Sequence, residues 1–67
     1  MNTKIGKLAF KQKLVEILEF EEKTAKLYGE ILGKIMKKEL YDMFVRLFEE
    51  EKAHVMMARE LIEIYNM

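Results

Sequence analysis

Apolar residues recur every three or four positions along most of the chain, and this recurrence loses phase once, between Ile35 and Leu40. Such spacing places side chains along one side of an α-helix. Gly33 lies just before the break, as a helix-ending glycine commonly does. The sequence therefore predicts an all-α chain with helices of roughly 4–34 and 38–66, joined by a tight turn near 35–38. The two stripes contain Leu14, Leu18, Glu21, Ala25, Tyr28, Leu32 and Ile35, and then Leu40, Phe44, Leu47, Glu51, His54, Ala58, Leu61 and Tyr65.

One continuous helix is the competing interpretation, because the expected turn contains no proline and no Asn-Gly or Asp-Gly pair. Such a helix would hold Glu21 and Glu51 about 45 Å apart, given the rise per residue of an α-helix. It would also have to join a coiled coil to cover its apolar surface. The phase break and Gly33 favour two antiparallel helices that form a hairpin.

The size of the chain predicts association with a second copy. It has 67 residues and no cysteine, and chains this short rarely bury enough surface to be stable alone. We therefore expect residues 1–67 to form one helical hairpin that dimerises into a four-helix bundle or assembles further. Additional apolar residues lie outside the two stripes, on more surface than one hairpin covers: Ile17, Phe20, Leu27, Ile31, Tyr41, Val45, Phe48, Val55 and Ile62.

Charge and hydropathy narrow the range of partners. Lysine plus arginine and aspartate plus glutamate number 12 each, so we expect no nucleic-acid partner and no anionic-membrane partner. No apolar run is long enough to predict a transmembrane helix. The first residues also lack the apolar stretch of a signal peptide. These features predict a cytoplasmic protein.

Both stripes are interrupted by residues of the wrong kind for a helix-bundle core. Glu21 lies in the first stripe, and Glu51 and His54 lie together in the second. A carboxylate in a core is costly unless it is paired or bound to a metal. The Glu-x-x-His spacing of Glu51 and His54 puts both side chains on one face, one turn apart. Glu21 and Glu51 are also equally distant in sequence from Met36, so a hairpin that turns there places them at the same level.

Two hairpins related by a two-fold axis would bring together four glutamates and two histidines. This is the ligand set of di-iron carboxylate bundles. The four carboxylates would also balance the charge of two divalent cations. Mixed oxygen and nitrogen ligands suit iron or manganese, and zinc or cobalt can also bind such a set.

Simpler interpretations exist for each residue taken singly. A lone histidine on a helix is more often a surface or core residue than a ligand. The consecutive residues Glu49, Glu50 and Glu51 can also be interpreted as an ordinary solvent-exposed run of charged side chains. Polar residues in a stripe can fix helix register without binding anything. The joint placement of Glu21, Glu51 and His54 favours a metal site.

Three neighbouring residues keep two interpretations each. Tyr28 lies two turns after Glu21, either as a core aromatic residue or as a hydroxyl beside the metal. Glu22 and Glu50 flank the expected ligands, either as solvated side chains or as further ligands.

Residues 18–28 and 48–54 resemble the rubrerythrin/ferritin-like superfamily. Glu21 followed seven residues later by Tyr28 is similar to one family motif, and Glu50-Glu51-Lys52-Ala53-His54 is similar to the Glu-Glu-Lys-x-His motif. The separation of Glu21 and Glu51 is close to that in encapsulated ferritins, which are also single hairpins with a di-iron site between chains.

The resemblance implies a ferritin-like four-helix bundle with Glu21, Glu51 and His54 as iron ligands. It further implies that Glu51 bridges the metals, that Tyr28 lies nearby and that the chemistry is that of a ferroxidase or of peroxide handling. The chain departs from rubrerythrins in having two helices and no cysteine-rich rubredoxin module, and from encapsulated ferritins in having no tryptophan near the site.

We therefore expect a homodimer that binds two iron ions, or manganese or zinc in their place, and oxidises Fe(II) with O₂ or H₂O₂. If the chain is an enzyme, it is an oxidoreductase of the ferroxidase or peroxidase type. The alternatives are a metal-binding module without catalysis and a purely structural helical assembly module.

Overall fold

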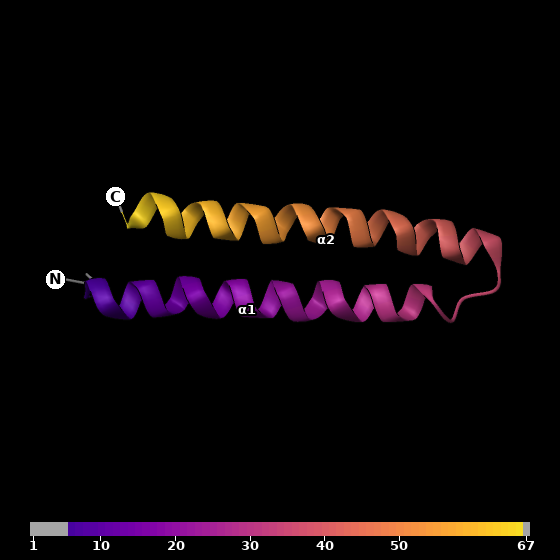
Figure 1. Cartoon of the computed structure of the whole chain (residues 1–67), viewed down its shortest axis with the longest axis horizontal. Helices are drawn as coiled ribbons and strands as arrows, with labels where there is room; N and C mark the ends of the chain where they lie inside the picture. The colour runs from indigo at the N-terminus through magenta and orange to yellow at the C-terminus, as the bar shows by residue number, and fades with distance from the viewer. Residues whose placement is uncertain (1–5, 67) are drawn as a thin grey trace, which may run out of the picture.

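The chain folds into two antiparallel α-helices, as Figure 1 shows for the computed structural model, which describes residues 6–66. Helix α1 spans Lys7–Leu32 and helix α2 spans Lys38–Tyr65. The start of α1 and the end of α2 lie at the same end of the hairpin (Figure 1). The predicted all-α hairpin is confirmed, and the alternative of one continuous helix is wrong. Residues 4 and 5, which the sequence analysis placed in the first helix, lie outside the described residues.

The connection between the helices is short, and its backbone adopts common conformations. Gly33 ends α1 with φ of −69°, and the backbone N–H of Lys34 donates a hydrogen bond of 2.9 Å to the carbonyl of Ile31. This conformation is open to any residue, so the turn does not use the special freedom of glycine. Lys37 precedes α2 in an extended conformation, and neither helix has a side-chain cap at its N-terminus. Because the helix starts are uncapped, packing between the helices supplies most of the stability.

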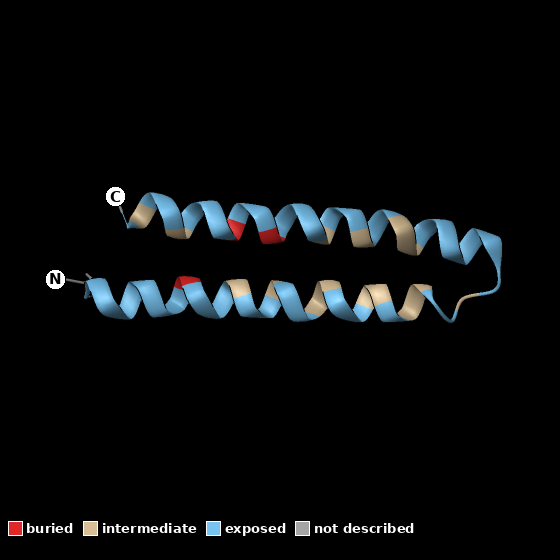
Figure 2. Ribbon diagram, in the orientation of Figure 1, coloured by how far each residue is buried: buried red, intermediate tan, exposed pale blue. Residues whose placement is uncertain are grey.

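The core of the hairpin is thin. Buried residues lie where the two helices face each other, and most of the ribbon is exposed (Figure 2). The hairpin measures 53 × 21 × 18 Å, which is a single layer of two helices. Among the described residues, the buried side chains are Leu14, Val55 and Ala58.

Helix α2 is rotated relative to the stripe that the sequence indicated. Leu40, Leu47 and Leu61 belong to that stripe, but their side chains are exposed. Val55 lay outside the stripe and is buried against α1, and the ring of Phe48 lies beside Gly29. Apolar residues cover more than one side of α2, so their spacing alone does not determine which side meets α1.

Specific contacts between the helices fix their relative position along the whole hairpin. At the open end, the hydroxyl of Tyr65 donates a hydrogen bond of 2.9 Å to the carbonyl oxygen of Lys7. The Tyr65 ring also packs on Phe10 with 4.9 Å between ring centroids. Near the turn, Tyr28 and Phe44 meet edge to face at 6.0 Å. These contacts hold α1 and α2 in one register.

In the part of the chain that the structure describes, neither helix is apolar enough over a sufficient length to cross a membrane.

Replacing Leu14 with alanine tests the helix interface. The side chain of Leu14 is buried between the helices, so we expect Leu14→Ala to lower the free energy of unfolding by about 2–3 kcal/mol. Leu8→Ala is the matched control, because Leu8 is exposed on the same helix and should change stability by less than about 0.5 kcal/mol. Urea unfolding followed by circular dichroism measures both, and equal losses would contradict the interface described here.

Candidate metal centre

Three side chains that can bind a metal converge between the helices. Glu21 comes from α1, and Glu51 and His54 come from α2. Each offers one ligand atom, and these atoms all lie within 4.8 Å of one another. The structure thus brings together the three residues that the sequence singled out, and their role as metal ligands stays a prediction.

Local helix geometry explains this convergence. Glu51 and His54 are one turn apart on the same side of α2, with Nδ1 of His54 3.6 Å from Oε2 of Glu51. The antiparallel register places Glu21 of α1 at the level of Glu51. That register is the one held by the contacts of Tyr65 with Lys7 and Phe10 at the open end.

The two ends of the cluster differ in their exposure to solvent. The side chain of Glu51 is 12% exposed, whereas that of His54 is 48% exposed. The Oε1 atom of Glu51 is buried and has no hydrogen-bond partner. A buried acceptor without a partner is costly in a folded protein, and it usually marks a place where a partner is missing.

The carboxyl group of Glu51 is held above its usual pKa. A hydrogen bond with the carboxyl of Glu21 is the main cause, followed by burial and by the charge of Glu21. His54 acts in the opposite direction and lowers the pKa of Glu51. Two carboxyl groups this close repel each other when both are ionised, so a cation between them would be stabilising.

The distances in the cluster fit a shared metal ion after a small closure. Metal–oxygen and metal–nitrogen bonds are about 2.0–2.2 Å long, so two ligands of one ion lie at most about 4.4 Å apart. The present limit of 4.8 Å exceeds that span only slightly, and the side chain of His54 is about half exposed. Three ligands also leave coordination positions open, as at a reactive metal.

The cluster opens toward one side of the hairpin. A shallow groove on that side is lined by both polar and apolar residues, and we call this side the site face, defined by Ile17, Glu21, His54, Met57, Ala58 and Leu61. A second hollow lies on the opposite side of the helix pair. We call that side the ion-pair face, defined by Glu22, Ala25, Lys52, Val55, Met56 and Arg59.

The other residues considered from the sequence do not join the cluster. The carboxylate of Glu22 forms an ion pair of 2.9 Å with Arg59 on the ion-pair face. Glu50 lines a separate hollow with Met43, Arg46 and Leu47. The ring of Tyr28 packs against Phe44, as the interpretation as a core aromatic residue predicts, and its role beside a metal stays a prediction.

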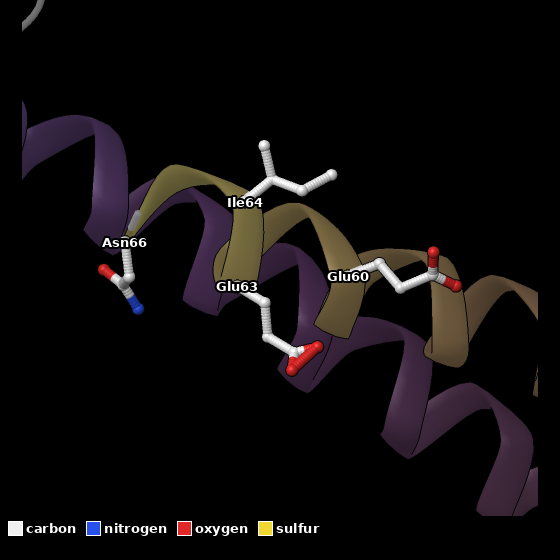
Figure 3. Close-up of a pocket in the computed structure, with 4 residues that line it drawn as sticks. All are labelled: Glu60, Glu63, Ile64 and Asn66. Atoms are coloured by element: carbon white, nitrogen blue, oxygen red, sulfur yellow. The ribbon is translucent and has the colours of Figure 1, made fainter.

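A further hollow lies at the C-terminal end of α2, away from the cluster. Three of its side chains come from α2 and the fourth comes from the residue that follows this helix, and the four point in different directions (Figure 3). They do not converge on a common point, so this hollow is a less suitable ligand site than the Glu21, Glu51 and His54 cluster. The lining residues are Glu60, Glu63, Ile64 and Asn66.

The sequence analysis missed two residues next to the site. Arg59 neutralises Glu22, and Met57 lies in the groove beside Glu21 and His54. The signal for Met57 is its position three residues after His54, which places both side chains on one face of α2. The Glu22–Arg59 pair is visible only once the register of the hairpin is known.

No protein-family model matches the chain, and comparisons with curated proteins and with solved structures find no significant match. The cluster of Glu21, Glu51 and His54 is therefore interpreted from its own geometry.

The raised pKa of Glu51 predicts how the stability of the metal-free protein depends on pH. The folded state binds its proton more tightly than the unfolded state, so Glu51 stabilises the fold at pH below about 4.3, its ordinary pKa. This contribution disappears as pH rises through the higher pKa of the folded state. We therefore compare the free energies of unfolding of the wild type and of Glu51→Gln. The value for the wild type minus that for the variant should fall as pH rises from about 4 to about 7.

Chemical unfolding at fixed protein concentration in the presence of a chelator measures this difference, since association also affects stability. Glu49→Gln is the control, because Glu49 is an exposed residue paired with Lys52. Parallel pH profiles for the wild type and Glu51→Gln would contradict the coupling between Glu21 and Glu51.

Proposed function

We propose that the chain is a di-iron-binding protein whose metal site is shared between two copies. In this proposal Glu21, Glu51 and His54 of each copy hold two iron ions per dimer, and bound Fe(II) is oxidised by O₂ or H₂O₂. Glu21 and Glu51 would supply the carboxylate ligands, and His54 would supply the nitrogen ligand.

The observation that carries the proposal is the partly buried cluster with an unpartnered Glu51 oxygen. If these residues served only to fix helix register, their polar atoms would be expected to satisfy one another. Instead two carboxyl groups and a histidine face a common point, with Oε1 of Glu51 left without a donor. A cation supplies what that arrangement lacks, because it binds carboxylate oxygens and removes their mutual repulsion.

The need for a second copy follows from the number of ligands. One hairpin offers three ligand side chains, whereas di-iron carboxylate bundles use four glutamates and two histidines from four helices. Two copies of this hairpin supply that set. The cluster opens onto the site face, so another hairpin can approach it there.

The donor set and the sequence resemblance both favour iron. Carboxylate and imidazole ligands suit Fe and Mn better than a thiolate set would. The segments around Glu21 and His54 resemble the rubrerythrin/ferritin-like superfamily, in which such sites oxidise iron. When two Fe(II) ions are bound, each can give one electron, and one H₂O₂ with two protons is then reduced to two waters. The chain's own residues would hold the ligand geometry, and the apolar groove residues Ile17, Met57 and Leu61 would limit access of water once a second copy covers them.

An anaerobic titration of chelator-treated protein with Fe(II) tests the site. We expect saturation near one iron per chain, followed by an oxo-ferric absorbance band on addition of air. Glu51→Ala and His54→Ala should weaken binding by more than about 100-fold, because loss of residues that merely orient ligands already costs about 10–100-fold. Glu49→Ala should bind as the wild type does, since Glu49 pairs with Lys52 outside the cluster. Unchanged binding in both ligand variants would refute the site.

Thermal unfolding gives an independent readout of metal binding. A metal that binds only the folded state stabilises it by about 2.7 kcal/mol at a free concentration 100 times its dissociation constant. We expect Fe(II) or Mn(II) to raise the Tm of the wild type and to leave that of Glu51→Ala unchanged. Saturable binding without consumption of O₂ or H₂O₂ would support the non-catalytic metal module. A Tm that is equal with and without chelator would support the structural helical module.

A further inference from the structure

Apolar side chains are concentrated on the side of the hairpin that carries the cluster. On each helix these side chains recur at intervals close to whole turns, counted from Ile17 on α1 and from His54 on α2. Each set therefore follows one side of its helix. All of them are exposed in the single hairpin. They are Phe10, Ile17, Phe20 and Leu27 on α1, and Met43, Leu47, Met57 and Leu61 on α2.

The ion-pair face is different, because its charged side chains already have partners within the hairpin. Glu22 pairs with Arg59 at 2.9 Å across the two helices. The ammonium group of Lys52 pairs with Glu49 at 2.9 Å and lies 4.9 Å from the centroid of the Phe48 ring. Covering this face would remove water from several charges. The other side carries Arg46 and Glu50 beside Met43 and Leu47. Around the ligands themselves, however, its lining residues are apolar: Ile17, Met57, Ala58 and Leu61.

The accessible surface of the hairpin is large for its mass. The chain exposes 5811 Å², whereas a compact monomeric protein of 8.0 kDa exposes about 4,450 Å². A compact protein of two such chains would expose about 7,400 Å², so pairing would bury about 4,200 Å² in total. That area is in the range of obligate homodimer interfaces, about 2,000–5,000 Å².

We propose that the site face is the docking surface for a second copy of this chain, which binds through its own site face. This inference deepens the proposed function and rests on it, because it identifies the surface through which the shared metal site is completed. A two-fold axis at the level of the cluster makes this contact self-complementary. Leu47 lies on one side of His54 along α2 and Leu61 on the other, so apolar groups surround the ligands in both directions.

Adjacent methionines provide a test that needs no mutation. Met57 lines the site face and Met56 lines the ion-pair face, and their exposures in one hairpin are similar, at 54% and 62%. Brief treatment of the metal-free protein with H₂O₂ converts accessible methionine to its sulfoxide. We expect Met56 to be oxidised several times faster than Met57, as measured by tandem mass spectrometry of the peptide that contains both. Diluting the protein until the dimer dissociates should remove the difference.

Matched variants of the same two residues test the contact energetically. Met57→Gln places a polar group of similar length on the site face of each copy, and loss of two buried Met side chains should raise the dissociation constant of the dimer by about 100-fold. Met56→Gln should leave it unchanged. Leu61→Gln is a second site-face variant. Sedimentation measures association, and circular dichroism verifies that helix content is retained.

The outcomes separate this inference from the proposed function. Protection of Met57 in a protein that binds no metal would support the docking surface and refute the metal site. Equal oxidation of both methionines at high concentration, or protection of Met56 instead, would overturn the docking surface. Iron binding by such a protein would leave the metal site standing.

Discussion

The approach of Glu21 and Glu51 across the helix pair is the constraint on which the candidate metal centre depends. Their carboxyl groups lie close together in a partly buried position, and the interaction with Glu21, together with burial, raises the pKa of Glu51. The arrangement costs stability when both groups are ionised, and His54 offsets only part of that cost. Contacts remote from the cluster, such as those of Tyr65 with Lys7 and Phe10, hold the two carboxyl groups together. A bound cation would turn a destabilising contact into a stabilising one.

A second constraint is the thinness of the core. In the described part of the chain, the buried side chains are too few to form the interior of a typical domain. Large apolar side chains such as Phe20 and Leu27 stay exposed, and they lie on the same side as the open end of the cluster. In our proposal, a second hairpin on the site face would both complete the metal site and cover the hydrophobic surface. This double role links the stability of the proposed dimer to its chemistry.

The sequence predicted the hairpin because helix periodicity and its phase break are local signals. It also predicted that Glu21 would meet Glu51 and His54, since a turn between the helices fixes which levels face each other. It did not predict the rotation of α2, because apolar residues occupy more than one side of that helix and Val55, rather than Leu47, turned out to face α1. The position of Met57 beside the site could be read from its spacing of three residues from His54, a signal that the sequence analysis did not use. Gly33 marked the end of α1 correctly, but its backbone conformation is one that any residue adopts.

Native mass spectrometry of the protein loaded anaerobically with Fe(II) tests the central claim most directly, because it reports chain number and metal number in the same ion. A site shared between two copies predicts dimers that carry two metal ions and monomers that carry none. Monomers that retain a metal ion would show that one hairpin is sufficient and would contradict a shared centre. Dimers that never carry metal would show that Glu21, Glu51 and His54 serve only the packing of the helices.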